Sequence, residues 1–365
     1  MSIEIDLVDL SRAVGRPVAT YDVEAIDPHL RIHSVTGGVY RVHGDGFSLV
    51  VKVIRNAADP DPQALWSGDA DPAGRNYWKR EWLAFDSGLL DALPGSLRAP
   101  RRLLTTEPGD DECWIWMEEV TGRPAVDWSI NDFAVAARHV GQTQGKFAAT
   151  PTQLPTAAWL SRRWLRGWVD ACAPLVDALR DDDLSDDRLA ALRPLRQRVL
   201  DLWQEREELL NVVESAPHTL VHCDLWGNNL FAESDATVAV DWSQVGIGAV
   251  AQDLDQMTLD TVWMPVRPDE SLEVLEAAIV PAYARGLHVG GFDVDESQVR
   301  RWYAAAASAH YPWMAGMVVV RAHQPDQVAG HEKRWGRDYT SIVMTRARVI
   351  EQALRLGEWA LESSA

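Results

Sequence analysis

The sequence predicts an α+β fold with two lobes, a small one built on an antiparallel sheet and a larger, mainly helical one. Short apolar runs separated by turn residues fill the first 117 positions, which is typical of strands joined in hairpins. Longer segments with apolar residues at helical spacing dominate from residue 123 onward. We therefore expect lobes at 1–117 and 123–365, joined by a hinge at 118–122. A chain of 365 residues is long enough to give both lobes a core.

Two strands joined by a tight turn open the predicted sheet. Residues 34–42 contain Gly37-Gly38 and run into an apolar strand. Asp45-Gly46 is then a strong hairpin signal before a return strand at 47–54. Glycines beside phosphate groups let backbone N–H groups approach closely. Gly37 and Gly38 are therefore candidates for a phosphate-binding segment, with an ordinary turn as the alternative.

Lys52 interrupts the apolar return strand. The chain has only four Lys among its 35 basic residues, so a Lys between valines is unusual here. A compact ammonium group suits the α- and β-phosphates of ATP. The alternative is an edge-strand Lys that discourages aggregation. A helix predicted at 76–85, with Asn76 as a possible N-cap, carries Glu81 as the candidate partner of Lys52. A solvated helix Glu is the alternative there.

The remaining elements follow in order. Strands at 101–104 and 114–117 flank a turn at 107–110, and the hinge comes next, where backbone groups can bond the edge of adenine. Helices are predicted at 133–147, 159–179, 189–213, 270–287, 296–322 and 338–361. The acidic run at 181–187 is expected to be a solvated turn between helices.

The most informative segment reads H-x-D-x-x-x-x-N and runs from His222 through Asp224 to Asn229. The following residues, 231–240, predict a hairpin that returns Asp241 beside Asn229. Phosphoryl transfer to a hydroxyl needs a carboxylate at the acceptor, with an amide oxygen and a second carboxylate on the metal. Loop and cap residues are the alternative interpretation. The spacing favours a phosphotransferase site.

These motifs together resemble the aminoglycoside phosphotransferase/choline kinase family. The resemblance rests on Gly37-Gly38, Lys52, Glu81, the 116–122 hinge, the H-x-D-x4-N segment, Asp241-Trp242, Gly246-x-Gly248 and Asp253-Leu254. It covers roughly residues 30 to 260. It implies a bilobal protein-kinase-like fold and transfer of phosphate from ATP, with Mg²⁺, to a small-molecule hydroxyl. The absence of an Ala-Pro-Glu segment after Asp241 argues against a protein kinase.

The resemblance also implies a role for individual residues. Asp224 would be the catalytic base, and Asn229 and Asp241 would bind the metal ion. Lys52 would contact phosphate, with Glu81 as its partner. The backbones of Glu118 and Val120 would bond adenine. The sequence departs from the family pattern at Cys223, where a Gly or a related residue is usual, and Cys is small enough to be tolerated.

The acceptor site is less well specified. Aromatic faces stack on sugar rings and attract amines, and carboxylates bind amino groups. Candidates near or after the motif are Trp226, Asp255, Asp260, Trp263 and Trp313. Each has core packing or helix surface as its alternative. We expect a cleft below the nucleotide, and an acceptor that is a sugar, aminosugar, aminoglycoside-like antibiotic or amino alcohol. The alternative function is a non-catalytic nucleotide-binding sensor or scaffold.

Composition narrows the class of partners. With a net charge of −19 and no basic patch, a nucleic-acid partner is not expected. No apolar run reaches 18 residues and the N-terminus lacks a signal-peptide pattern, so a membrane partner is not expected either. Three widely spaced Cys indicate a reducing, cytoplasmic setting. Acidity also suits a cationic substrate, although solubility is the favoured explanation. The oligomeric state stays open.

Overall fold

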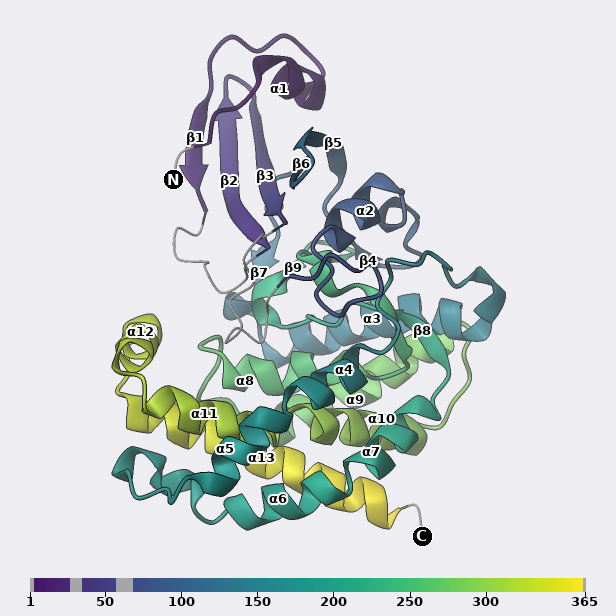
Figure 1. The fold of residues 1–365 in the computed structure, drawn as a ribbon. Coiled ribbons are helices and arrows are strands. Elements are labelled where there is room, and N and C mark those ends of the chain that lie inside the picture. Colours follow the sequence, from purple (N-terminus) through teal and green to yellow (C-terminus); the bar gives the residue numbers. More distant parts are fainter. Residues whose placement is uncertain (1–2, 27–34, 57–67, 364–365) are drawn as a thin grey trace.

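The computed structural model describes residues 3–26, 35–56 and 68–363. A β-sheet lies at one end of the molecule and most of the helices lie at the other (Figure 1). Among the described residues, no helix is both long and apolar enough to cross a membrane. Ser34, the first residue of the predicted glycine segment, lies outside the described ranges.

The N-terminal sheet has five antiparallel strands in the order β1-β2-β3-β6-β5. They are β1 (Asp22–Ala25), β2 (Thr36–Gly44), β3 (Phe47–Arg55), β5 (Arg102–Gly109) and β6 (Glu112–Glu118). The β2–β3 hairpin turns at Gly46, whose φ of 70° lies in the left-handed region that favours glycine. The hairpin predicted from Asp45-Gly46 is therefore confirmed.

Each face of this sheet is covered by a different helix. Val51 and Val53 pack in one cluster with Leu10 of α1 (Leu7–Val14), a helix that we did not predict. Ile54 packs in another with Phe85 of α2 (Arg80–Asp86). Successive side chains of a strand point to opposite faces, so Lys52 shares the α2 face with Ile54. As a result, the ammonium group of Lys52 lies next to α2.

Gly37 and Gly38 lie inside β2, not in a turn before it, which corrects the sequence prediction. The pairing of β2 with β3 shifts register between Thr36 and Gly38, as at a β-bulge. Gly38 has a φ of 152°, and a Cβ there would lie 2.5 Å from the buried Tyr40 ring. Close packing and backbone conformation therefore both require glycine at position 38.

The helix α2 begins four residues later than predicted, at Arg80, and Asn76 is not its N-cap. The backbone of Asn76 instead accepts a hydrogen bond from Asp69 N, and Trp78 N donates to the Asp69 carbonyl. This small loop competes with helix formation. The fully buried Arg80 then donates to the carbonyl oxygens of Trp159 and Ser243, which fixes α2 against the rest of the molecule.

Two small sheets support the motif segment. One has the order β4-β10-β9-β7, with β4 (Leu97–Arg98), β7 (Arg123–Pro124), β9 (Leu230–Ala232) and β10 (Thr237–Ala239). The other pairs β8 (His218–Val221) with β11 (Gly246–Ala249). β9 and β10 form the predicted antiparallel hairpin. Val240 N then donates to the Asn229 carbonyl oxygen at 2.9 Å, which returns Asp241 to the motif as expected.

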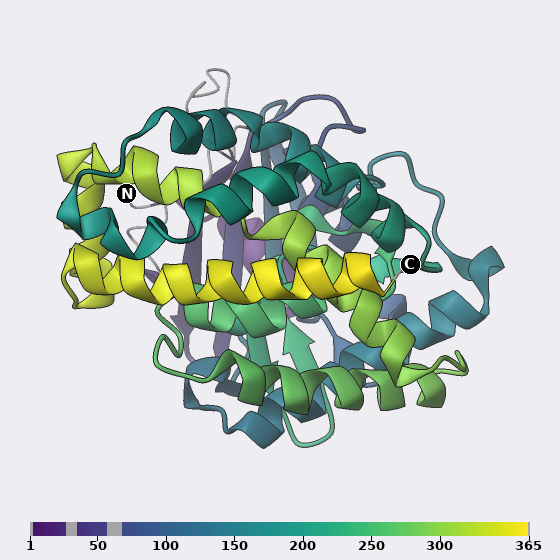
Figure 2. The ribbon, with the colours of Figure 1, turned by 90° about the horizontal axis from the view of Figure 1, so that it is seen from below.

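The helical part is larger than the sheet part and surrounds an extensive apolar core. Its helices are α3 (Ile130–Ala149), α4 (Trp164–Ala171), α5 (Ala173–Asp181), α6 (Arg196–Gln204), α7 (Arg206–Glu214), α8 (Thr261–Trp263), α9 (Leu272–Val289), α10 (Glu296–His310), α11 (Met314–Ala322), α12 (Pro325–Trp335) and α13 (Tyr339–Glu362). Seen from below, α13 lies across its neighbours (Figure 2). A Cβ at Gly141 of α3 would lie 2.3 Å from the Tyr283 carbonyl of α9, so glycine permits this close helix packing.

Three predicted helices are each divided in the structure. Residues 159–179 form α4 and α5, residues 189–213 form a short 3₁₀ helix with α6 and α7, and residues 296–322 form α10 and α11. Pro312 stands between α10 and α11, where it cannot continue the hydrogen bonding of a helix. α12, which begins at Pro325, was not predicted.

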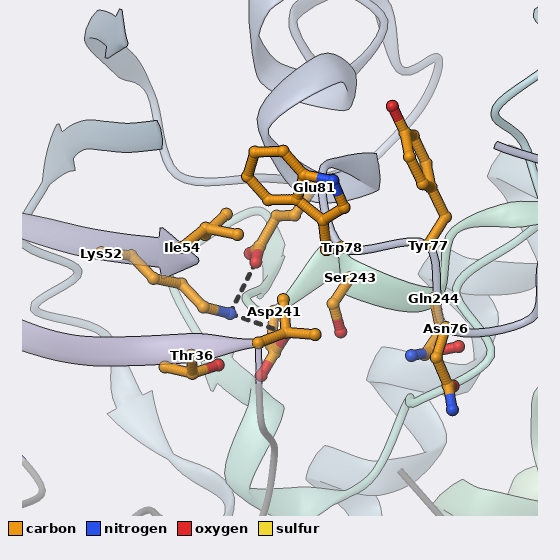
Figure 3. Close-up of a pocket in the computed structure, with 11 residues that line it drawn as sticks. Thr36, Lys52, Ile54, Asn76, Tyr77, Trp78, Glu81, Asp241, Ser243 and Gln244 are labelled. Carbon is orange, nitrogen blue, oxygen red and sulfur yellow. Dashed lines mark hydrogen bonds and ion pairs between the residues drawn. The ribbon is translucent and has the colours of Figure 1, made fainter. Parts of the chain in front are cut away.

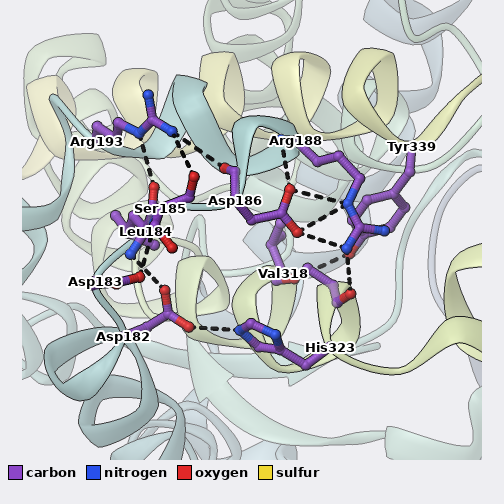
Figure 4. Close-up of polar contacts among 11 residues, drawn as sticks. Asp182, Asp183, Leu184, Ser185, Asp186, Arg188, Arg193, Val318, His323 and Tyr339 are labelled. Atoms are coloured by element: carbon purple, nitrogen blue, oxygen red, sulfur yellow. Dashed lines mark hydrogen bonds and ion pairs between the residues drawn. The ribbon is translucent and has the colours of Figure 1, made fainter.

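The acidic run between α5 and α6 is more structured than a solvated turn. Asp182 accepts a hydrogen bond from Leu184 N and pairs with His323 at 2.6 Å (Figure 4). Asp186 caps the next turn and binds Arg188 through both carboxylate oxygens. These acidic side chains therefore hold the local backbone and the end of α11 together.

Candidate active site

Lys52, Glu81 and Asp241 meet in a pocket between the sheet, α2 and the segment after β10 (Figure 3). The Lys52 ammonium lies 2.6 Å from Glu81 Oε2 and 2.8 Å from Asp241 Oδ1. Glu81 Oε1 also accepts a hydrogen bond from Trp242 N at 3.2 Å. One buried carboxylate thus orients both Lys52 and the backbone that follows Asp241.

Electrostatics keep Lys52 positively charged. Burial alone lowers the pKa of its ammonium group, but the charges of Asp241 and Glu81 outweigh burial and raise that pKa. Burial raises the pKa of Glu81, against the opposing effect of Lys52. Asp241 is the most accessible member, with 34% of its side chain exposed. It has a φ of 62°, an uncommon left-handed conformation for a residue other than glycine.

Asp253, a buried carboxylate after β11, holds the backbone of the motif loop. Its two carboxylate oxygens accept hydrogen bonds from His222 N and Cys223 N, each at 2.9 Å. Gln144 of α3 donates to the same carboxylate at 2.8 Å. Cys223 has a φ of 61°, so its backbone is strained and needs these contacts. The segment 253–254 resembled the family, but no sequence signal gave Asp253 this role.

The side chains of Asp224 and Asn229 are joined by a hydrogen bond. Asn229 Nδ2 donates to the Asp224 carbonyl oxygen and to Asp224 Oδ2, each at 2.8 Å. The amide nitrogen is thereby committed, so the side-chain oxygen of Asn229 is the atom that could bind a metal ion. Burial, and then the charges of Asp241 and Asp260, raise the pKa of Asp224 well above its usual range. The carboxylate of Asp224 thus binds a proton more tightly than an ordinary Asp carboxylate does.

The side-chain oxygen atoms of the site suit a hard cation that is bound by protein and phosphate oxygens together. Mg²⁺ is commonly held by one or two protein oxygens together with substrate phosphates. The side-chain oxygens of Asn229 and Asp241 could provide such a pair. Across the described ranges, no group of three or more His, Cys, Asp or Glu side chains is arranged for a metal ion. A dedicated all-protein metal cage is therefore not part of the described structure.

The predicted hinge follows β6. Glu118 N donates to the Arg101 carbonyl at 3.0 Å, so only its carbonyl oxygen is left to bond adenine. The Glu118 carboxylate binds Arg98 and the backbone of Arg101. Val120 is half-buried. Glu118, the first residue of the hinge, is thus held through its N–H by the Arg101 carbonyl and through its carboxylate by Arg98 and the Arg101 N–H.

The five acceptor candidates separate into two groups. Trp226 and Asp260 are half-buried. Asp255, Trp263 and Trp313 are 2%, 2% and 0% exposed. Asp255 pairs with His310 at 2.7 Å, and Trp313 packs edge-on against Trp203. Asp255, Trp263 and Trp313 are therefore interior residues, and we no longer assign them to the acceptor. The burial of these side chains depends on packing between helices that are far apart in the sequence, so the sequence alone does not show it.

A model of the phosphotransferase enzyme family matches residues 34–289, which is most of the chain. The chain belongs to the phosphotransferase enzyme family. No curated protein sequence matches it. The family of the sequence prediction is thereby confirmed.

Solved structures with the same fold extend this result. A spectinomycin phosphotransferase in complex with ADP and spectinomycin has a TM-score of 0.55 at 14% identity, over 95% of this chain and 98% of that one. A microcompartment-associated aminopropanol kinase has a TM-score of 0.55 at 14% identity, over 98% of both chains. An amicoumacin kinase with AMP-PNP and Ca²⁺ has a TM-score of 0.54 at 13% identity, over 90% and 88%. These similarities confirm the bilobal, kinase-like fold class.

Substitution of Lys52 is expected to lower activity more than substitution of its partner Glu81. Lys52→Ala is expected to lower kcat/KM for ATP by about 10²-fold, because it removes a preorganised donor to phosphate. Glu81→Ala is expected to lower it by about 10-fold, equivalent to about 1.4 kcal/mol, because Asp241 still holds Lys52. Steady-state kinetics with varied ATP measures both. Glu208→Ala, at an exposed position of α7, is the control. A larger loss for Glu81→Ala than for Lys52→Ala would contradict the assigned order.

Asp253→Asn is expected to destabilise the fold by about 1–3 kcal/mol, because an amide has one accepting oxygen for the two backbone N–H groups that Asp253 now binds. The NH₂ group of the new Asn must then face one of these backbone N–H groups, and two donors cannot form a hydrogen bond. Urea denaturation measures the loss, and Asp187→Asn, at an exposed site, is the matched control. An unchanged unfolding midpoint would show that the motif loop does not depend on this carboxylate.

Proposed function

We propose that this protein transfers the γ-phosphoryl group of ATP, with Mg²⁺, to a hydroxyl group of a small molecule. The observation that carries the proposal is the joint placement of Lys52, Glu81 and Asp241 on one side and the bonded pair Asp224–Asn229 on the other. Membership of the phosphotransferase family supports the same reaction class.

Each side chain has a proposed part in the reaction. Lys52 binds the α- and β-phosphates, and Glu81 fixes its position. Asn229 and Asp241 hold Mg²⁺, which neutralises charge on the phosphate oxygens. Asp224 positions the acceptor hydroxyl and accepts its proton. Catalysis then rests mainly on positioning and charge stabilisation.

The lobe boundaries are part of this proposal. Residues 1–117 form the nucleotide lobe, 118–122 the hinge and 123–365 the lobe that binds the acceptor. In the hinge, Glu118 offers its carbonyl oxygen and Val120 its backbone groups to adenine. Gly37 and Gly38 lie at the start of β2, where Gly38 pairs with Val53 next to Lys52, and we assign them to the phosphate side. Three unpaired, buried Cys suit a cytoplasmic setting.

The acceptor class comes from the family resemblance and from structures of the same fold. Proteins with this fold act on spectinomycin, amicoumacin and aminopropanol, according to their names. We propose a sugar, aminosugar, aminoglycoside-like antibiotic or amino alcohol as acceptor. Trp226 and Asp260, which are half-buried, remain the candidates for its contacts.

An ADP-release screen tests the proposal. The purified protein is incubated with ATP and Mg²⁺ and one acceptor at a time, and product phosphate on the acceptor is identified by mass spectrometry. Acceptor-dependent ADP formation is the expected result. Binding of Mg-ATP without transfer to any acceptor would favour the alternative, a nucleotide-binding sensor or scaffold.

A further inference from the structure

One buried side-chain amide holds both of the peptide groups that flank Asp224. Gln256 Oε1 accepts a hydrogen bond from Leu225 N at 2.8 Å, and Gln256 Nε2 donates to the Cys223 carbonyl oxygen at 2.9 Å. The Cys223 carbonyl belongs to the peptide group before Asp224, and the N–H of Leu225 belongs to the peptide group after it. The orientations of these two planar groups set φ and ψ of the residue between them. Gln256 therefore restrains the backbone of Asp224 from both sides.

The two ends of this amide are not interchangeable. An amide oxygen accepts hydrogen bonds, whereas an amide NH₂ group donates them. Each end of Gln256 meets the kind of backbone group that suits it, and the side chain is buried. Asp253, the other side chain that holds this loop, binds the N–H groups of His222 and Cys223 and accepts hydrogen bonds only. The Cys223 carbonyl oxygen needs a donor, and Gln256 provides it.

A second set of buried contacts holds Gln256 itself. Its backbone N donates to Asp255 Oδ1 at 2.6 Å, and Asp255 Oδ2 pairs with His310 Nδ1 at 2.7 Å. The His310 ring packs edge-on against the rings of Trp164 and Trp168, with centroids 5.2 Å and 5.1 Å away. The buried pair of Asp255 and His310 thus anchors the start of the turn that carries Gln256.

The backbone that carries Gln256 is a π-helix, which spans Gln256–Asp260 and runs into α8. Such wider turns are rare in proteins and frequently lie at functional sites. This one begins at Gln256, which brackets Asp224, and ends at Asp260, a half-buried candidate for contact with the acceptor. One short element therefore carries both the residue that restrains the base and a residue proposed to meet the substrate.

We propose that Gln256 is a positioning residue for the reaction, which fixes the backbone of Asp224 so that Asp224 Oδ1 points at the acceptor hydroxyl. The inference rests on the proposed function, in which Asp224 is the base. Asn229 Nδ2 binds Asp224 Oδ2 at 2.8 Å, so within the described part of the chain Oδ1 is the carboxylate oxygen that remains for the hydroxyl. A base acts only within hydrogen-bond reach of the proton it takes, and a displacement of about 1 Å costs about 10²-fold in rate.

Gln256→Met removes both hydrogen bonds with little change in side-chain volume. We expect kcat to fall by about 10²-fold, because the base is no longer held in place. The KM for ATP should stay unchanged, because Gln256 binds the backbone beside the base and no residue of the proposed nucleotide site. Gln352→Met is the matched control, since Gln352 is a buried amide of α13 that binds Glu276 at 3.0 Å. Steady-state kinetics on an acceptor from the ADP-release screen, with melting curves of both variants, measures the effect.

Gln256→Glu is a conservative variant whose hydrogen bonding depends on pH. When neutral, the introduced carboxyl group has an accepting oxygen and an O–H donor, the same pattern as the amide. When ionised, both of its oxygens only accept, so one of them faces the Cys223 carbonyl oxygen without a proton between them. Burial and nearby carboxylates are expected to raise the pKa of the introduced group. Titratable groups on the surrounding elements are Cys223 and Asp224 of the motif loop, Asp253 and Asp255 before the π-helix, and His310 of α10.

The kcat of Gln256→Glu divided by that of the wild type is therefore expected to depend on pH. The ratio should be highest at low pH, where the neutral group keeps both hydrogen bonds. It should fall by about 10-fold or more between about pH 5 and about pH 9, as the group ionises and Asp224 loses its restraint. Dividing by the wild-type value removes the effect of titration of Asp224 itself, which both proteins share.

The outcomes separate two failures. A ratio that does not change with pH, a wild-type kcat in Gln256→Met, or an equal loss in Gln352→Met overturns this inference and leaves the proposed function intact. If Gln256→Met does not fold, the pH dependence of Gln256→Glu decides alone. A wild type that binds Mg-ATP but phosphorylates no acceptor contradicts the proposed function itself, and the inference falls with it.

Discussion

Asp224→Asn is expected to lower kcat by about 10²–10⁴-fold, the range typical of losing a general base, while ATP binding and the fold stay intact. The substitution is nearly isosteric. Its amide oxygen can still accept the hydrogen bond from Asn229 Nδ2, which Asp224 Oδ2 accepts at 2.8 Å. What it removes is the site that takes the proton of the acceptor hydroxyl. The loss should therefore fall on kcat and not on KM for ATP.

The measurement compares kcat of the wild type and the variant on an acceptor identified by the ADP-release screen. Asp235→Asn is the matched control, because it makes the same chemical change in the exposed turn between β9 and β10. Melting curves of both variants show whether the fold is preserved. Wild-type turnover by Asp224→Asn would mean that another group accepts the proton, and the assignment of the base would be wrong.

The sequence predicted the parts of the site that depend on local pattern. Lys52 was singled out because it interrupts an apolar strand, and Glu81 of the following helix was named as its candidate partner; the two side chains form an ion pair at 2.6 Å. The 231–240 hairpin returned Asp241 to the motif because turn residues separate two short apolar runs. Each of these inferences needed only the spacing of neighbouring residues.

The sequence could not predict the parts that depend on contacts between distant segments. Asp253 supports the motif loop from 30 and 31 residues away, and Arg80 donates to a carbonyl 163 residues away. The apolar spacing of Trp313 is the same for a core residue and a cleft residue, so only the packed structure shows that Trp203 covers it. Arg346 of α13 likewise meets the rings of Trp263 and Trp335 only when α8, α12 and α13 pack together. The spacing of side chains along the sequence does not show which distant segments come into contact.

Asp241→Asn is expected to abolish the dependence of nucleotide affinity on Mg²⁺ and to lower kcat by about 10³-fold, because it removes a charged oxygen ligand where charge stabilisation dominates catalysis. Asn is chosen over Ala because Asp241 has a φ of 62°, a conformation that Asn tolerates. The fold should survive, since Lys52 keeps a one-to-one pair with Glu81 at 2.6 Å. Asn229→Ala should be less severe, because it removes a neutral ligand and no charge.

Calorimetric titration with a non-hydrolysable ATP analogue, with and without Mg²⁺, measures the prediction directly. The wild type should bind more tightly when Mg²⁺ is present, Asn229→Ala should keep part of this gain, and Asp241→Asn should keep none. Asp235→Asn again serves as the control for a lost surface charge. Because Asp241 also pairs with Lys52 at 2.8 Å, its removal frees Lys52 to bind phosphate, so affinity without Mg²⁺ should hold or improve. An equal gain from Mg²⁺ in Asp241→Asn and the wild type would remove Asp241 from the metal site, since the proposed ligand would then make no difference to the ion.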